Sequence, residues 1–365
     1  MISDIKSILE KKDLEHDDII ALLQSDDEQA AFLYRKAAAV KEKYLGNTVY
    51  LRGLIEYSNI CGKNCLYCGI RRDNRRIKRY RLTNNEVIEA ALFAHRMNFG
   101  SIAIQAGENS SPEFVDNVES LIYRIRKLTD KSLGITLSLG EQETETYRRW
   151  YEAGAHRYLL RIEASSINLY RKVHPDDEMH DYYRRVSCLK AIQETGYQTG
   201  TGVMIGLPHQ TMNDLADDVI FMRDFDIDMC GMGPFIEHSD TPLGIRGTNN
   251  LFLKERFGLT LRMIAIMRLV MKDINIVAST AMQTVDPTGR EKAIMCGANI
   301  IMPNITPDKY RENYKIYEGK PGYRETDPNN ISGLSLSLIP GATIGAGKWG
   351  DAAHYKARTS SELKS

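Results

Sequence analysis

Apolar runs rich in isoleucine, valine and leucine recur along the chain and predict eight β-strands. These runs lie at 49–57, 101–106, 134–139, 157–163, 199–206, 228–235, 274–280 and 299–305. The segments between them carry helix signals, such as Thr83 followed by Glu86 in the pattern of a capping box. Strands that alternate with helices favour a parallel sheet, and eight of them predict an α/β fold of the closed (β/α)8 TIM-barrel type.

The two ends of the chain follow other patterns. Residues 1–45 place leucine and isoleucine at helical spacing between polar residues, which predicts an N-terminal helical extension. Residues 46–310 are expected to form the barrel. Residues 311–365 begin with a turn-rich stretch and continue as a mixture of glycine, serine and leucine. We expect this C-terminal tail to wrap around the barrel or to pack across one of its ends.

Composition narrows the class of protein. Hydrophobic residues make up 42% of the chain and charged residues 26%, which is ordinary for a soluble globular protein. Basic and acidic residues number 48 each, so the net charge favours neither nucleic acid nor an anionic membrane as a partner. No apolar stretch approaches the ~20 residues that span a bilayer, and the charged N-terminus has no apolar signal core. We therefore expect a cytoplasmic protein.

The strongest chemical signal is a group of three cysteines directly after the first predicted strand. Cys61, Cys65 and Cys68 have the spacing C-x3-C-x2-C. Three thiolates at this spacing suit three irons of a [4Fe–4S] cluster and leave the fourth iron open to a small molecule. The alternative is a zinc site, which would normally use a fourth Cys or His with a short spacing of its own. The other three cysteines are isolated and are interpreted as small core residues.

Further candidates lie where predicted strands end, the face that carries the active site in this class of barrel. Glu108 follows Gly107, so its carboxylate could receive hydrogen bonds from a ligand ammonium, or it could be a solvated loop residue. Arg161 and Glu163 alternate along one predicted strand, so their side chains share a face. They could bind a ligand inside the barrel, form a structural ion pair, or face outward toward the helices. Arg185 could hold a ligand carboxylate or lie on the surface.

The segment 71–81 contains seven basic residues and one acidic residue. Charge runs are usually solvated, and this one has no aromatic residues arranged to stack nucleic acid bases. Beside an anionic cluster, such a run could stabilise charge or dock a reductant.

The chain also resembles a known family. The cysteine spacing is the signature of radical S-adenosylmethionine (SAM) enzymes. The sequence around it resembles the HydE family of [FeFe]-hydrogenase maturases over roughly residues 15–320. Biotin synthase and methylornithine synthase are more distant relatives. The segments that carry the resemblance are 57–83, 134–141, 204–211, 233–243 and 296–307.

The resemblance implies a [4Fe–4S] cluster on the three cysteines and reductive cleavage of SAM to a 5′-deoxyadenosyl radical. It also implies site residues at matching positions. Those expected to contact the cofactors are Tyr67, Gln105, Gly107, Glu108, Ser138, Arg161, Glu163, Arg185 and Met204, and those expected at the substrate cavity are Tyr314, Tyr317 and Met282.

The substrate implied by the resemblance is an iron–carbonyl–cyanide cysteine complex used in H-cluster assembly. The implied partners are an electron donor such as ferredoxin or flavodoxin and other hydrogenase maturases. Ile162 departs from the pattern, because histidine is expected there in HydE. This change leaves open a HydE-like paralogue, either an amino-acid mutase of the methylornithine synthase type or a carbon–sulfur bond-forming enzyme. A non-catalytic carrier of an iron cluster is the alternative from a different class.

Overall fold

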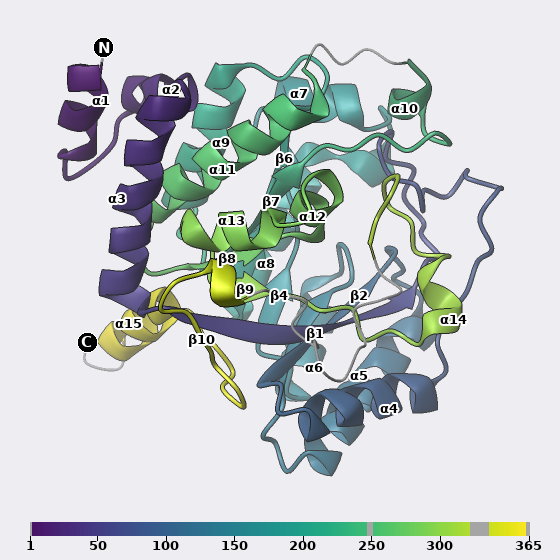
Figure 1. Cartoon of the computed structure of the whole chain (residues 1–365). Helices are drawn as coiled ribbons and strands as arrows, with labels where there is room; N and C mark the ends of the chain where they lie inside the picture. Colours follow the sequence, from purple (N-terminus) through teal and green to yellow (C-terminus); the bar gives the residue numbers. More distant parts are fainter. Residues whose placement is uncertain (1, 247–250, 322–335, 363–365) are drawn as a thin grey trace.

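The computed structural model describes residues 2–246, 251–321 and 336–362 (Figure 1). Its strands form a closed parallel barrel in the order β1-β2-β3-β4-β5-β7-β8-β9, with β9 pairing back to β1. The short strand β6 follows β5 and pairs with β7. The predicted (β/α)8 fold is therefore confirmed. The strands of the barrel are β1 (Thr48–Ser58), β2 (Ser101–Ala106), β3 (Gly134–Ser138), β4 (Arg157–Leu159), β5 (Gln198–Thr201), β6 (Met204–Ile205), β7 (Met229–Pro234), β8 (Asn275–Ala278) and β9 (Ile300–Ile301).

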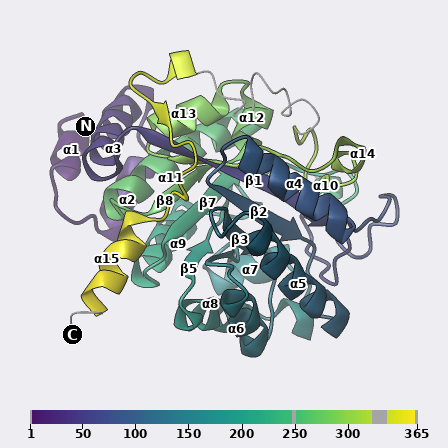
Figure 2. The same cartoon turned by 90° about the horizontal axis from the view of Figure 1, so that it is seen from below.

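Helices surround the strands, as the view turned by 90° shows (Figure 2). The capping box predicted at Thr83 is present, since Thr83 and Glu86 each accept a hydrogen bond from the other's backbone N–H at the start of α4. The helices are α1 (Ile2–Leu9), α2 (His16–Leu23), α3 (Asp27–Leu45), α4 (Asn84–Arg96), α5 (Pro112–Leu128), α6 (Thr144–Glu152), α7 (Ile167–Val173), α8 (Tyr182–Thr195), α9 (Met212–Asp224), α10 (Pro242–Arg246), α11 (Leu253–Val270), α12 (Thr280–Val285), α13 (Gly289–Met295), α14 (Asp308–Arg311) and α15 (Ala353–Glu362). None of the described helices is long and apolar enough to cross a membrane.

Several strands are shorter than their apolar runs predict. The fourth strand ends at Leu159, and further along the same apolar run Glu163 adopts a φ of 66°, which does not fit a strand. The fifth is interrupted at Gly202, where an added Cβ would lie 1.8 Å from the carbonyl oxygen of Gly231. The last residues of the fourth run therefore lie in a loop at the C-terminal end of the barrel, and the fifth run is divided between β5 and β6.

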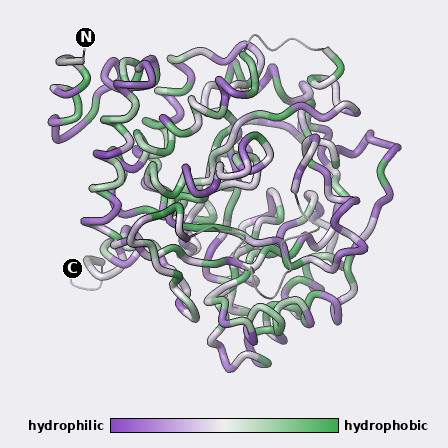
Figure 3. The backbone as a smooth tube through the Cα atoms, in the orientation of Figure 1, coloured by the Kyte–Doolittle hydropathy of each residue, from purple (hydrophilic) through white to green (hydrophobic). Residues whose placement is uncertain are grey.

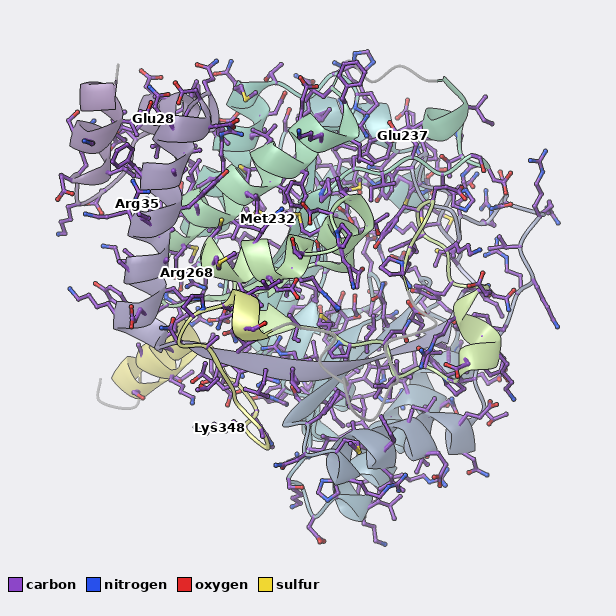
Figure 4. All side chains as sticks on the ribbon, viewed as in Figure 1. Glu28, Arg35, Met232, Glu237, Arg268 and Lys348 are labelled. Carbon is purple, nitrogen blue, oxygen red and sulfur yellow. The ribbon has the colours of Figure 1, made fainter. Side chains whose placement is uncertain are left out.

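Apolar side chains from the strands and the surrounding helices form one continuous core. Ile102, Ile135 and Leu137 are fully buried in it, and Met232 of β7 lies near the centre of the molecule (Figure 4). A second, smaller apolar cluster, packed against Leu66 and Tyr67 of the cysteine loop, consists of Ala164, Leu169, Val173, Leu207, Phe235 and Leu243.

The N-terminal helices lie on one side of the barrel (Figure 1). Helix α3 packs along α11, and α2 packs on α9 and α11. Lys41 of α3 is buried and donates a hydrogen bond of 2.7 Å to the carbonyl oxygen of Ile294. Burial lowers the pKa of Lys41 to about 8. The domain boundaries expected at residues 45 and 310 stay predictions.

Residues 343–362 of the C-terminal tail pack across the N-terminal end of the barrel, whereas residues 311–321 lie at the opposite end, where the Gly69 N–H donates to the Ile316 carbonyl oxygen at 2.9 Å. Strand β10 (Thr343–Ile344) pairs with the start of β1, and Lys348 lies on the loop that follows it (Figure 4). Gly350 and Asp351 then contact four barrel strands near their N-terminal ends. The Gly350 carbonyl oxygen accepts hydrogen bonds from Arg52 (3.2 Å) and Asn275 (2.8 Å). The Asp351 carboxylate accepts one from Gln198 (2.7 Å) and forms an ion pair with Arg157. Packing across one end was one of the two expectations for the tail; residues 322–335 lie outside the described residues.

Helix α15 is held against the barrel by ion pairs of His354, whose pKa is shifted. His354 lies 3.0 Å from Asp273 and 2.6 Å from Asp226, which Arg358 also contacts at 2.9 Å. The hydrogen bonds to Asp273 and Asp226 raise the pKa of His354 to about 9. Because this folded-state pKa exceeds the unfolded value of about 6.5, the stabilisation is complete below about pH 6.5 and is lost as pH rises through about 9.

We therefore expect His354→Gln to lower the melting temperature at about pH 6 and to have little effect above about pH 9.5. Calorimetric melting curves of both proteins across this range measure the difference. A difference that stays constant with pH would contradict the assignment.

Candidate active site

The three motif cysteines lie on the loop that follows β1, at the C-terminal end of the barrel. All three are partly buried and free of disulfides. The backbone N–H of Glu108 donates to the Cys61 sulfur at 3.3 Å, and Cys61 and Cys68 also receive backbone hydrogen bonds from Lys63 and Ile70. Burial raises the pKa of the Cys65 thiol to about 12, and the neighbouring Cys61 adds to the effect. Burial disfavours the charged thiolate, so loss of the protons from these thiols would need a positively charged partner, such as iron.

No three His, Cys, Asp or Glu side chains converge as ligands of a single metal ion within the described ranges. The three remaining cysteines are buried, as predicted: Cys188 in α8, Cys230 in β7 and Cys296 at the end of α13.

Arg79 fixes the course of the cysteine loop. Its guanidinium donates to five backbone carbonyl oxygens, those of Asn59, Ile70, Arg71, Arg72 and Asn74, at 2.6 to 3.2 Å. This arginine of the basic run is therefore structural, which the charge pattern alone did not indicate.

Gly107 lets the cysteine loop approach β2. A Cβ on Gly107 would lie 2.5 Å from the Ile60 carbonyl oxygen and 2.7 Å from the Cys61 Cβ. The bare backbone expected to admit a ligand is thus occupied by the loop itself.

We expect Gly107→Ala to destabilise the protein by about 1–3 kcal/mol and to lower its iron content, because backbone atoms must shift. Gly62→Ala is the matched control in the same loop, since its nearest neighbours would lie 3.5 Å away. Denaturant unfolding and iron analysis of both variants test this, and equal behaviour of the two would contradict it.

Four buried charged side chains form a group beside the cysteine loop, which we call the charge quartet: Lys63, Glu108, Glu141 and Arg185. Lys63 lies 3.2 Å from Glu108 and 3.0 Å from Glu141. Arg185 lies 2.5 Å from Glu141 and 4.0 Å from Glu108. The exposed fractions of the four side chains run from 1% for Glu141 to 15% for Glu108, so neither Glu108 nor Arg185 is a solvated surface residue.

The two carboxylates of the quartet differ in their environments. Burial raises the pKa of Glu108. Burial acts in the same direction on Glu141, but Arg185 and Lys63 outweigh it and hold the pKa of Glu141 below its usual value. The backbone N–H of Glu141 also donates to Glu108 at 3.0 Å. Glu108 is therefore the carboxylate that more readily exchanges its partners.

Arg161 and Glu163 form an ion pair at the same end of the barrel. The Arg161 Nε lies 3.0 Å from both carboxylate oxygens of Glu163, and the guanidinium also donates to the carbonyl oxygens of Val203 and Gly231 at 2.8 Å. Both residues follow β4, so placing them on a strand is wrong, although their side chains do meet. Ile162 between them is fully buried in the main core.

The other residues expected near the cofactors lie around the same rim. The Tyr67 hydroxyl is 3.1 Å from His174 Nε2. Gln105 and Ser138 pair in register on β2 and β3, and Met204 is on β6.

The residues expected at the substrate cavity come from α12 and from the chain that follows α14. Tyr314 is buried beside Lys320, whose Nζ lies 5.4 Å from its ring centroid. The Tyr317 hydroxyl is 2.8 Å from the Thr280 hydroxyl. Met282 is fully buried in α12.

Sequence reasoning missed Lys63 and one further buried pair, and it noted Glu141 at a strand end without giving it a role. Lys63 lies inside the cysteine motif. Glu141 follows Gly140 just as Glu108 follows Gly107, and this repeated Gly-Glu at the ends of adjacent strands was a signal that could have given it one. Glu56 is fully buried and forms an ion pair with Lys320, and no local pattern predicted that contact.

Comparison with known proteins decides the family. Residues 55–222 match the Radical SAM superfamily. The chain is 46% identical over 289 residues to the [FeFe] hydrogenase maturase subunit HydE of Thermotoga maritima, covering 79% of each chain. The chain belongs to the HydE family of radical SAM enzymes.

More distant relatives agree with this assignment. The chain is 29% identical over 251 residues to biotin synthase of Geobacillus kaustophilus, covering 67% of this chain and 72% of that one. Its fold matches the crystal structure of methylornithine synthase (PylB) with a TM-score of 0.78 at 24% identity, covering 94% and 97% of the two chains. The fold of this HydE family member is thus shared with other radical SAM enzymes.

Proposed function

We propose that this HydE family member is a radical SAM maturase of [FeFe]-hydrogenase. In this proposal it cleaves SAM reductively and acts on an iron–carbonyl–cyanide cysteine complex during H-cluster assembly. The observation that carries the proposal is the set of three thiols facing the charge quartet, in a chain 46% identical to HydE. When bound, the cluster and SAM would supply one electron and a 5′-deoxyadenosyl radical.

The residues present fit a [4Fe–4S] cluster. Cys61, Cys65 and Cys68 supply three thiols from one loop, and N–H groups of Glu108, Lys63 and Ile70 already donate to two of their sulfurs. Hydrogen bonds to sulfur are among the means by which proteins tune such clusters.

The residues beside the thiols also fit the amino acid part of SAM. Glu108 has a carboxylate that can accept hydrogen bonds from an ammonium group, and Arg185 and Arg161 can donate to a carboxylate. In the structure Glu108 pairs with Lys63, Arg185 with Glu141 and Arg161 with Glu163, so a ligand bound here would exchange with these partners. The tail closes the opposite end of the barrel, which supports entry of ligands from the cysteine side.

The test uses anaerobically reconstituted protein with dithionite, SAM and one candidate substrate at a time. The proposal predicts release of 5′-deoxyadenosine that increases with a synthetic iron–carbonyl–cyanide cysteine complex. Stimulation by a free amino acid instead would favour the methylornithine synthase type of paralogue, and formation of a new carbon–sulfur bond would favour the other type. No 5′-deoxyadenosine under any condition would contradict the proposal and favour a carrier of iron clusters.

A further inference from the structure

We propose that the exposed basic loop, residues 71–78, is the docking surface for a small acidic electron-donor protein. This inference rests on the proposed function, because the thiols must hold a cluster that is reduced. The donor would lose one electron and the cluster would gain it, with no bond formed or broken.

The basic loop directly follows the cysteine loop in space and in sequence. It projects at the edge of the molecule, between β1 and α4 (Figure 1), and most of it is strongly hydrophilic (Figure 3). Arg72, Arg75, Arg76 and Lys78 are exposed. An electron donor must approach the cluster closely, and this loop lies on the surface next to the thiols.

The basic loop is held in place by the residues that also shape the cysteine loop. Asn64 lies between two of the motif cysteines, and its amide donates to Asp73 at 2.6 Å. Asn74 donates to the Gly69 carbonyl oxygen at 2.7 Å, and Arg79 binds backbone carbonyls on both loops. The exposed arginines therefore project from a fixed turn, which lowers the entropy cost of binding.

Charge is concentrated here in a chain that is neutral as a whole. Residues 71–79 contain six basic residues and one acidic residue, whereas the full chain carries a formal net charge of zero. Asp73 contacts Arg72 at 3.3 Å and Asp240 contacts Arg76 at 2.6 Å, so the positive charge is reduced but remains in excess. Such a patch attracts an acidic partner and orients it.

An apolar edge lies beside this patch. Ile60 is 40% exposed and Met179 is 43% exposed. The Met179 sulfur is 3.9 Å from an Arg72 nitrogen, and its methyl carbon would be 3.5 Å from a Cβ on Gly62. A charged patch with a small apolar surface beside it suits a weak, transient interface such as those of electron transfer. A single-stranded nucleic acid would need exposed rings to stack on, and the aromatic residue of this segment, Tyr80, is buried.

The test compares two triple variants of the reconstituted enzyme. The docking variant carries Arg72→Glu, Arg75→Glu and Arg76→Glu; Arg71 and Arg79 are kept because they bind loop carbonyls. The control variant carries Arg124→Glu, Lys127→Glu and Lys131→Glu, exposed basic residues at and just after the C-terminal end of α5. Flavodoxin is the probe, as an acidic one-electron donor. Its Kd is measured by calorimetry, and cluster reduction is followed by stopped-flow absorbance.

We expect the docking variant to bind flavodoxin at least ~10-fold more weakly and to be reduced correspondingly slowly, while the control variant matches the wild type. Dithionite-driven formation of 5′-deoxyadenosine should be equal in all three proteins. The wild-type Kd should also weaken as salt rises, which tests the inference without any substitution. Equal Kd values for the docking and control variants, or a wild-type Kd independent of salt, would overturn it. Absence of 5′-deoxyadenosine with dithionite in the wild type would instead count against the proposed function.

Discussion

Cys65→Ala is expected to abolish both cluster binding and SAM cleavage. Removing this thiol leaves only two of the three motif cysteines, and two thiolates do not hold a cubane with three ligated irons. Iron and sulfide should fall to background after anaerobic reconstitution, and 5′-deoxyadenosine should be undetectable.

Cys296→Ala is the matched control for this prediction. Cys296 is buried behind α13, outside the motif, and alanine fits where a small buried side chain stood. This variant should keep its iron and its activity. Full iron content and undiminished turnover in Cys65→Ala would contradict the assignment of the loop.

Arg185→Met is expected to lower the free energy of unfolding by about 3–5 kcal/mol, because it leaves a buried carboxylate without its closest partner. Glu141 is 1% exposed and lies 2.5 Å from Arg185. Arg148 on α6 is 57% exposed and contacts the exposed Glu145 at 2.6 Å, so Arg148→Met should cost no more than about 0.5 kcal/mol. Denaturant unfolding of the two variants gives the comparison.

The same substitution should also weaken SAM binding by ~10–100-fold, through loss of a charge-assisted contact. A double variant separates the two effects. Adding Glu141→Gln to Arg185→Met removes the uncompensated charge and should restore part of the stability without restoring SAM affinity. The role given to Arg185 would be contradicted if the stability losses of Arg185→Met and Glu141→Gln were strictly additive in the double variant. An unchanged Kd for SAM in Arg185→Met would also contradict it.

The barrel could be predicted because its signal is local and repeated. Each apolar run contains a strand of the barrel, and the capping box at Thr83 marks a helix start within four residues. The strand ends were less accurate, because they depend on backbone conformations imposed by neighbours. Glu163 adopts a positive φ, and Gly202 packs on the Gly231 backbone.

In the candidate site, too, the features that are local in sequence could be predicted and those that depend on the fold could not. The cysteine motif is contiguous in sequence, so its chemistry could be inferred directly. The charge quartet comes from four separate segments, and its pairings exist only after the barrel closes. Arg185 therefore had two open interpretations, and only the structure places it against Glu141.

The departure at Ile162 also changes meaning once the fold is known. Its side chain is buried in the main core, and its backbone N–H donates to the Thr201 hydroxyl at 3.1 Å. Ile162 therefore packs as a core side chain, and the substrate assay described above distinguishes a HydE maturase from a paralogue.

The central claim is a cluster with one iron that the protein leaves open, and Mössbauer spectroscopy of anaerobically reconstituted, iron-57-labelled protein tests it most directly. The account predicts the spectrum of a [4Fe–4S] cluster in which one iron site changes when SAM is added, with the other three unaffected. Bound zinc in place of the cluster, or a cluster whose irons all ignore SAM, would contradict it.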